Sequence, residues 1–204
     1  VSGGHSHIVE VADYTTFKII GKTRDDAAGE AFDKAARVLG LPYPGGAEID
    51  KLSKAGDVNT VKFPRIELEG APYDFSFSGL KTSVINHVHK LNQKGEDYNK
   101  ADIAASFNMA VADTLTSKFL LAIKNKGYDI CAVAGGVAAN SMLRNKLTEE
   151  CNKNGIKLFM PPLSLCGDNA AMVGCQGYYE YLTGNIADMS LNGYATMNIE
   201  NIYY

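Results

Sequence analysis

Residues 21–50 hold the feature that most restricts the fold, because both ends of a helix can be located there from the sequence alone. A polar turn with Asp25 and Asp26 is followed by apolar residues at three- and four-residue spacing, which predicts a helix over 27–39. Gly40 comes directly after it, where glycine commonly ends a helix. A proline-containing loop then leads to Gly45 and Gly46, where the backbone can pass close to a flat or charged group.

The apolar patterns of the whole chain predict an α/β fold with glycine-rich turns where strands meet helices. An almost continuous apolar run over 129–134 predicts a buried strand that enters a turn at Gly135 and Gly136. The other predicted elements are a hairpin over 5–23, strands over 64–68, 73–77 and 156–160, and helices over 48–55, 78–92, 101–126, 141–153 and from about 168 to 181.

Composition and charge narrow the class of protein. The 204 residues suit one large domain or a domain and a half, and no apolar run approaches the roughly 18 residues of a membrane span. The net charge of -3 provides no overall positive field for nucleic acid, so any nucleic-acid-binding surface would have to be a local basic patch. The four cysteines lack CxxC spacing and the density of secreted scaffolds, which indicates a reduced, cytoplasmic setting.

Several polar groups sit where a ligand site is commonly built. The Ser2-Gly3-Gly4 turn is suited to offering backbone N–H groups to an anion. Asn140, directly after the paired-glycine turn, offers both a donor and an acceptor. Lys81, in the first turn of a predicted helix, is either a surface lysine or the partner of an anion.

Two further features have alternative interpretations. Asp168 precedes a predicted helix, so it is either a helix cap or a metal ligand. His5 and His7 face the same side of a strand, either as structural residues or as two metal ligands that lack a third. The chain opens as if in the middle of a strand and turn, so we expect a fragment, or the C-terminal part of a longer protein.

Seven motifs in order resemble one family, the universal tRNA threonylcarbamoyladenosine transferases, formerly described as O-sialoglycoprotein endopeptidases. The motifs are VSGGH at 1–5, DDAAGEAFDK at 25–34, LGLPYPGG at 39–46, FSFSGLKT at 75–82, DIAASF at 102–107, AGGVAAN at 134–140 and DNAAM at 168–172. The resemblance implies the two-lobed fold of actin, sugar kinases and Hsp70-type ATPases, with residues 1–204 as the C-terminal lobe and part of the shared core. It also implies transfer of threonylcarbamoyl from threonylcarbamoyl-AMP to N6 of adenosine 37 in tRNAs that read ANN codons.

The resemblance also implies roles for individual residues, carried over by motif. The residues that would bind the nucleotide or its acyl group are Val1, Ser2, Gly3, Gly4, Asp33, Gly46, Asp50, Gly135, Gly136 and Asn140. Within this set Asp33 and Asp50 would hold ribose hydroxyls, as carboxylates do in nucleotide sites. Asp168 would be a metal ligand, with iron or zinc as the expected divalent ion. That ion and backbone N–H groups would polarise the carbonyl during acyl transfer, and no general base can be assigned.

The sequence departs from the family pattern in one large respect. The other two metal ligands of the family come from a His-x-x-x-His motif upstream of VSGGH, which this sequence lacks together with the N-terminal lobe. We therefore expect this chain alone to be inactive, and its exposed apolar surface to favour self-association. The expected partners are tRNA and accessory proteins of the modification pathway, with no membrane.

Two other functional classes stay open at this point. The first is an ATP-binding phosphotransferase or ATPase of the same fold, which would release phosphate where the transferase releases AMP. The second is a non-catalytic scaffold paralogue, against which the presence of Asp33, Asn140 and Asp168 argues. The endopeptidase description has no support, since the chain shows neither a zinc-protease helix motif nor a recognisable triad.

Overall fold

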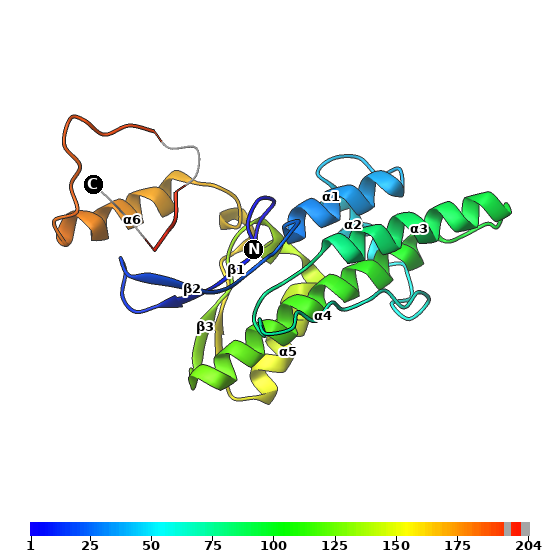
Figure 1. Ribbon diagram of the computed structural model, residues 1–204, viewed down its shortest axis with the longest axis horizontal. Helices are drawn as coiled ribbons and strands as arrows, with labels where there is room; N and C mark the ends of the chain where they lie inside the picture. The colour runs from blue at the N-terminus through cyan, green and yellow to red at the C-terminus, as the bar shows by residue number, and fades with distance from the viewer. Residues whose placement is uncertain (194–196, 201–204) are drawn as a thin grey trace.

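The computed structural model describes residues 1–193 and 197–200 and has an α/β architecture (Figure 1). It begins with an antiparallel hairpin of β1 (His7–Val11) and β2 (Phe17–Lys22), as predicted. Four helices follow, α1 (Ala28–Val38), α2 (Gly45–Ser53), α3 (Ser78–Lys94) and α4 (Lys100–Lys126). The rest comprises β3 (Ile130–Ala132), a 3-10 turn η1 (Gly136–Ala139), α5 (Ser141–Lys153), β4 (Lys157–Phe159), a 3-10 turn η2 (Leu163–Leu165) and α6 (Ala170–Leu182).

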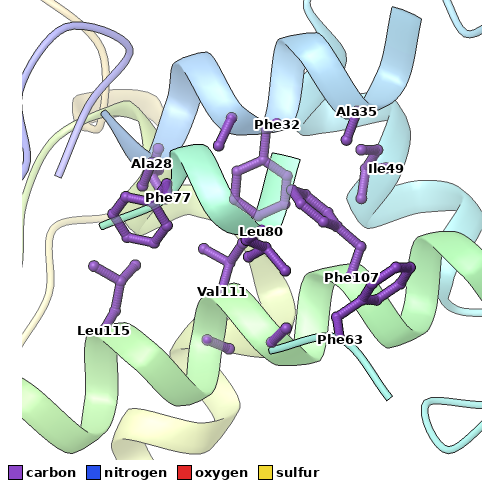
Figure 2. Packing of buried hydrophobic residues seen from close by; sticks show 14 of the residues in the cluster. Ala28, Phe32, Ala35, Ile49, Phe63, Phe77, Leu80, Phe107, Val111 and Leu115 are labelled. Atoms are coloured by element: carbon purple, nitrogen blue, oxygen red, sulfur yellow. The ribbon is translucent and has the colours of Figure 1, made fainter. Parts of the chain in front are cut away.

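Helix α4 is the centre of the hydrophobic core. Its 27 residues span about 40 Å, and it buries side chains on several sides because α2, α3 and α5 all pack against it. Figure 2 shows Phe107 of α4 next to Phe32 of α1, and the two rings meet edge to face with centroids 5.4 Å apart. Ile49 of α2 and Leu80 of α3 belong to the same buried cluster, so this core fixes the mutual positions of the four helices.

Glycines end two of these helices where the sequence predicts it. Gly40, just after α1, has φ +71°, and Gly127, the residue that ends α4, has φ +73°. This left-handed conformation costs glycine little, and it lets the N–H groups at the helix end reach back to the last carbonyls. The C-terminal ends of these two helices are therefore set by local chemistry.

The strands form two separate two-stranded sheets. β3 and β4 pair in parallel, but no hydrogen bond joins this pair to the β1–β2 hairpin among the described residues. The predicted buried strand over 129–134 is shorter than expected and largely uncovered, since only Cys131 is buried and Ile130 is 56% exposed. One sheet neighbour and one packed face explain why an apolar run remains partly open.

The two short strands predicted after α2 do not form. Residues 64–68 pair with no other strand in the described chain, and near residue 75 there is a single bridge, between Thr23 and Phe75. Arg65 and Glu67 instead form ion pairs with Asp113 and Lys118 of α4. The two charged side chains of this alternating segment thus pair with a helix, and the segment does not join a sheet.

Helix α6 lies apart from the helical core, beside the tip of the hairpin (Figure 1). Tyr179 of α6 stacks on Tyr14 of the hairpin loop with ring centroids 3.8 Å apart, and Gln176 donates to the Tyr14 carbonyl at 3.0 Å. Within the described ranges, no helix has both the length and the apolar character that crossing a membrane requires.

Candidate functional site

Val1 holds the turn of residues 2–4 against the turn at Gly135 and Gly136. The Val1 nitrogen donates to the Ala134 carbonyl at 2.8 Å, and the Val1 carbonyl accepts from the Val137 nitrogen at 3.1 Å. Gly135 has φ +97°, and a Cβ there would lie 2.4 Å from the Val1 oxygen. Only glycine fits such a position, so residue 1 and the turn at Gly135 meet here through backbone alone.

The turn of residues 2–4 lies on the first turn of α1. The Ser2 carbonyl accepts from the Gly29 nitrogen at 3.1 Å, and a Cβ on Gly29 would lie 2.7 Å from the Gly3 Cα. Gly3 and Gly4 face open space, and their N–H groups donate to no acceptor among the described residues. Two free N–H groups in one glycine turn can bind an anion or a polarised carbonyl.

Asp33 of α1 determines where α2 begins. Its Oδ1 accepts from the Gly45 nitrogen at 2.8 Å, so the helix starts at Gly45 and not at the predicted position 48. A Cβ on Gly45 would lie 2.5 Å from the Ala36 Cβ, whereas one on Gly46 would lie 3.8 Å from the Phe32 Cβ. Asp33 is half-buried and uses one carboxylate oxygen for this bond, which leaves Oδ2 without a partner in the described chain.

Asp50 of α2 does the same for α5. Its Oδ1 accepts from the Ser141 nitrogen at 3.0 Å and from the Ser141 hydroxyl at 2.8 Å. Asn140, which precedes the helix, accepts from the Leu143 nitrogen at 3.0 Å through its side-chain oxygen. Each of the two aspartates therefore satisfies orphan N–H groups at a helix start with one oxygen and leaves the other oxygen available.

These contacts join the sequence-predicted site residues into one continuous assembly, which we call the helix-end cluster. It consists of Val1–Gly4, Asp33, Gly45, Gly46, Asp50, Gly135, Gly136 and Asn140. The contacts run from residue 1 through η1 and α5 to α2, and from α2 through α1 back to Ser2. Ten residues predicted from separate motifs thus come together in the tertiary structure, with Gly45 as an addition.

Asp168 is the predicted site residue that lies outside this cluster. It is exposed, and the cap of α6 is its neighbour Asn169, whose side chain accepts from the Met172 nitrogen at 3.0 Å. The cap interpretation of Asp168 is therefore wrong. No three His, Cys, Asp or Glu side chains gather into a possible metal site anywhere in the described part of the chain.

Comparison with known proteins identifies the family. The model of the TsaD family, tRNA N6-adenosine threonylcarbamoyltransferase, matches residues 1–175. The chain belongs to this family. It is similar to the tRNA N6-adenosine threonylcarbamoyltransferase of Clostridioides difficile (strain 630), with 54% identity over 199 residues that cover 98% of this chain and 59% of the relative. The relative in Moorella thermoacetica is 54% identical over 192 residues, which cover 94% of this chain and 56% of the relative.

The TsaD-family chain thus spans less than three-fifths of the length of these curated relatives, and the family resemblance of its motifs is confirmed. Among solved structures, it resembles the HypF of T. kodakarensis with a TM-score of 0.58 and 20% identity, covering 78% of this chain and 20% of HypF. A full-length HypF in the phosphate- and nucleotide-bound form gives a TM-score of 0.57 at 18% identity, with 77% and 20% covered. At these identities the likeness concerns the fold alone.

The residues of this TsaD-family chain do not by themselves fit the expected metal. Asp168 is one exposed carboxylate, and a firmly held transition-metal ion needs three or more protein ligands. His5 and His7 lie with ring centroids 5.5 Å apart and have no third ligand among the described residues. Burial and the neighbouring His5 lower the pKa of His7. No catalytic step is therefore assigned to a metal in this chain.

An acidic pair that the sequence showed only as a polar turn joins helices α1 and α3. Asp25 accepts four hydrogen bonds, from the nitrogens of Phe77 and Ser78 and the hydroxyls of Ser76 and Ser78, at 2.6–3.1 Å. It thereby caps the start of α3. Burial raises the pKa of Asp25, but these hydrogen bonds outweigh it and hold the pKa below its usual value.

Asp26 pairs with two lysines from different helices. Its carboxylate lies 3.0 Å from the Lys34 ammonium and 2.7 Å from the Lys81 ammonium. Burial raises the pKa of Asp26, yet the two lysines outweigh that effect and keep the pKa low. The anion expected beside Lys81 is therefore a side chain of the same molecule.

Replacement of Asp26 by asparagine should make the acid unfolding of this TsaD-family chain less steep. A carboxylate with a lowered folded-state pKa stabilises the fold above its unfolded pKa of about 3.9, and this contribution is lost as the pH falls through the folded pKa. The melting temperature of the variant should lie below that of the wild type at pH 7, and the gap should close below about pH 4.

Asp97→Asn is the matched control for this titration. Asp97 is exposed and forms no ion pair within the described chain. Its variant should follow the wild-type curve at every pH. A constant difference between Asp26→Asn and the wild type from pH 7 to pH 2 would contradict the assigned role of Asp26.

Proposed function

We propose that this chain forms the nucleotide-binding part of a transferase that moves a threonylcarbamoyl group from threonylcarbamoyl-AMP to N6 of adenosine 37 in tRNAs that read ANN codons. The observation that carries the proposal is the helix-end cluster, in which residues from four separate motifs and Asp50 meet and leave polar groups unused. We also propose that the fold is the C-terminal lobe of the actin-like architecture. The family match, together with the similarity in fold to HypF, supports that view.

The unused groups of the cluster suit the parts of an acyl adenylate. In this proposal, the free oxygens of Asp33 and Asp50 accept hydrogen bonds from ribose hydroxyls, as carboxylates do in nucleotide sites. The N–H groups of Gly3 and Gly4 donate to the phosphate or the carbamoyl oxygen. Gly46, with no side chain, lets the nucleoside lie against the start of α2.

The reaction is an acyl transfer that balances without a further co-reactant. The N6 amine of adenosine attacks the carbonyl carbon of the threonylcarbamoyl group and forms a C–N bond. The bond from that carbon to the phosphate oxygen breaks, AMP leaves, and the attacking nitrogen loses a proton. The N–H groups of Gly3 and Gly4 would stabilise negative charge that develops on the oxygen during attack.

The test uses a chimera, because this chain covers 59% of the Clostridioides difficile relative. The aligned 199 residues of that relative are replaced by this chain, and threonylcarbamoyladenosine in tRNA is measured by mass spectrometry of nucleosides. The accessory proteins that we propose as partners are supplied in the assay. The chimera should modify tRNA and release AMP, and Asp50→Ala should reduce the rate at least about tenfold.

The two alternatives predict different outcomes of the same assay. Release of phosphate from ATP without any tRNA product would favour a phosphotransferase or ATPase. A folded chimera that modifies no tRNA, under conditions in which the Clostridioides difficile protein modifies tRNA, would overturn the proposal and favour the non-catalytic scaffold.

A further inference from the structure

A buried amide on α4 connects Asn140 with Asp50, two polar residues of the helix-end cluster. Asn108 has no exposed surface, and its side-chain oxygen accepts from the Asn140 side-chain nitrogen at 2.9 Å. Its own nitrogen donates to the Ser53 hydroxyl at 3.1 Å and to Oδ1 of Asp50 at 3.4 Å. Sequence reasoning missed Asn108 because it follows directly after a motif whose pattern is that of a buried helix face.

The hydrogen bonds of Asn108 determine which atoms the cluster presents. The Asn140 oxygen is committed to the Leu143 nitrogen, and one N–H of its amide is committed to Asn108. The remaining N–H is free to donate, and the oxygen, which already accepts one hydrogen bond, keeps a second lone pair, so the N–H is the fully free group at Asn140. Asp50 has Oδ1 committed to Ser141 and Asn108, and Oδ2 remains as an acceptor.

We propose that Asn108 is a positioning residue that holds Asn140 as a hydrogen-bond donor and Asp50 as an acceptor toward an adenine nucleotide. The inference rests on the proposed function. It defines the ligand atoms as an acceptor beside Asn140, such as a phosphate oxygen or a ring nitrogen, and a hydroxyl beside Asp50. Loss of Asn108 would leave the Asn140 side chain held by the Leu143 nitrogen alone and one of its buried N–H groups without an acceptor, so its orientation would be less firmly fixed.

Two measurements on this chain test the inference. The first is calorimetric titration with AMP, and the second is NMR of the Asn140 side-chain amide protons without any ligand. Asn108→Leu removes both hydrogen-bonding functions at similar volume, and Ser53→Ala removes one partner of Asn108 as a milder change. We expect Asn108→Leu to weaken AMP binding about tenfold, and both variants to shift the Asn140 amide signals and speed their exchange.

Thr116→Val is the matched control. Thr116 lies on the same helix and is 2% exposed, and its hydroxyl has no hydrogen-bond partner in the described chain. Its loss should leave both AMP affinity and the Asn140 signals unchanged. If Asn108→Leu does not fold, Ser53→Ala still provides both measurements.

The outcomes separate this inference from the proposed function. Unchanged Asn140 signals in both Asn108→Leu and Ser53→Ala would overturn the positioning role, whatever the affinity for AMP. If the variants alter the Asn140 signals but the wild-type chain binds no AMP, the result would support the positioning of Asn140 by Asn108. It would count against nucleotide binding by this chain.

Discussion

The variant Phe107→Ala is expected to lose about 3–5 kcal/mol of its free energy of unfolding. Phe107 is fully buried on α4, and its ring lies against Phe32 of α1 and Phe63 of the connecting segment, with centroids 5.4 Å and 6.5 Å away. Alanine would leave a cavity between two helices that cannot close without moving the α1–α4 contact (Figure 2). Denaturant unfolding at constant m-value measures the loss.

Phe159→Ala controls for the removal of a phenyl ring as such. Phe159 of β4 is 50% exposed, and the Lys157 ammonium lies 5.0 Å from the centroid of its ring. We expect a loss below about 1 kcal/mol. Equal losses for the two variants would show that the aromatic cluster around Phe107 does not hold the helices together.

Gly45→Ala is expected to destabilise the chain by about 1–3 kcal/mol, whereas Gly46→Ala, one residue later, should be close to neutral. A Cβ at Gly45 would meet the Ala36 Cβ at 2.5 Å and the Asp33 Cα at 2.8 Å, so α1 and α2 would have to separate. At Gly46 the nearest atom would lie at 3.8 Å, and alanine is a better helix former than glycine.

Thermal and denaturant unfolding of both variants provide the comparison, and AMP titration adds a functional measurement. Separation of α1 from α2 breaks the bond from the Gly45 nitrogen to Asp33, so Gly45→Ala should also weaken any nucleotide binding that depends on Asp33. Equal stability of the two alanine variants would contradict the close packing of α1 on α2.

Local chemistry made several elements predictable. The bounds of α1 and α5, the hairpin and the glycine stops at Gly40 and Gly127 follow from apolar periodicity and from the conformational freedom of glycine, which act over a few residues. The same reasoning failed over 64–68, where Arg65 alternates with apolar neighbours because it reaches Asp113 of α4. Periodicity reports that alternate side chains have different surroundings, and not what those surroundings are.

In the candidate site, too, local sequence patterns predict some features and long-range contacts decide others. Its residues were named from motifs, but their assembly depends on contacts between distant parts of the chain, such as Val1 with Ala134 and Asp50 with Ser141. A sequence also cannot show which carboxylate oxygen a helix start consumes, or that Lys81 is already neutralised by Asp26. The role of Asn108 is invisible without the three partners around it.

By itself, the sequence determined the α/β class, the order of most helices and the family, because these depend on short-range patterns and on motifs that are read in order. The tertiary structure decided the split into two small sheets, the separation of Asp168 from the helix-end cluster and the polar atoms that remain free for a ligand. These features depend on which groups, distant in the sequence, form hydrogen bonds with each buried donor and acceptor. Those partners are determined only when the whole chain folds.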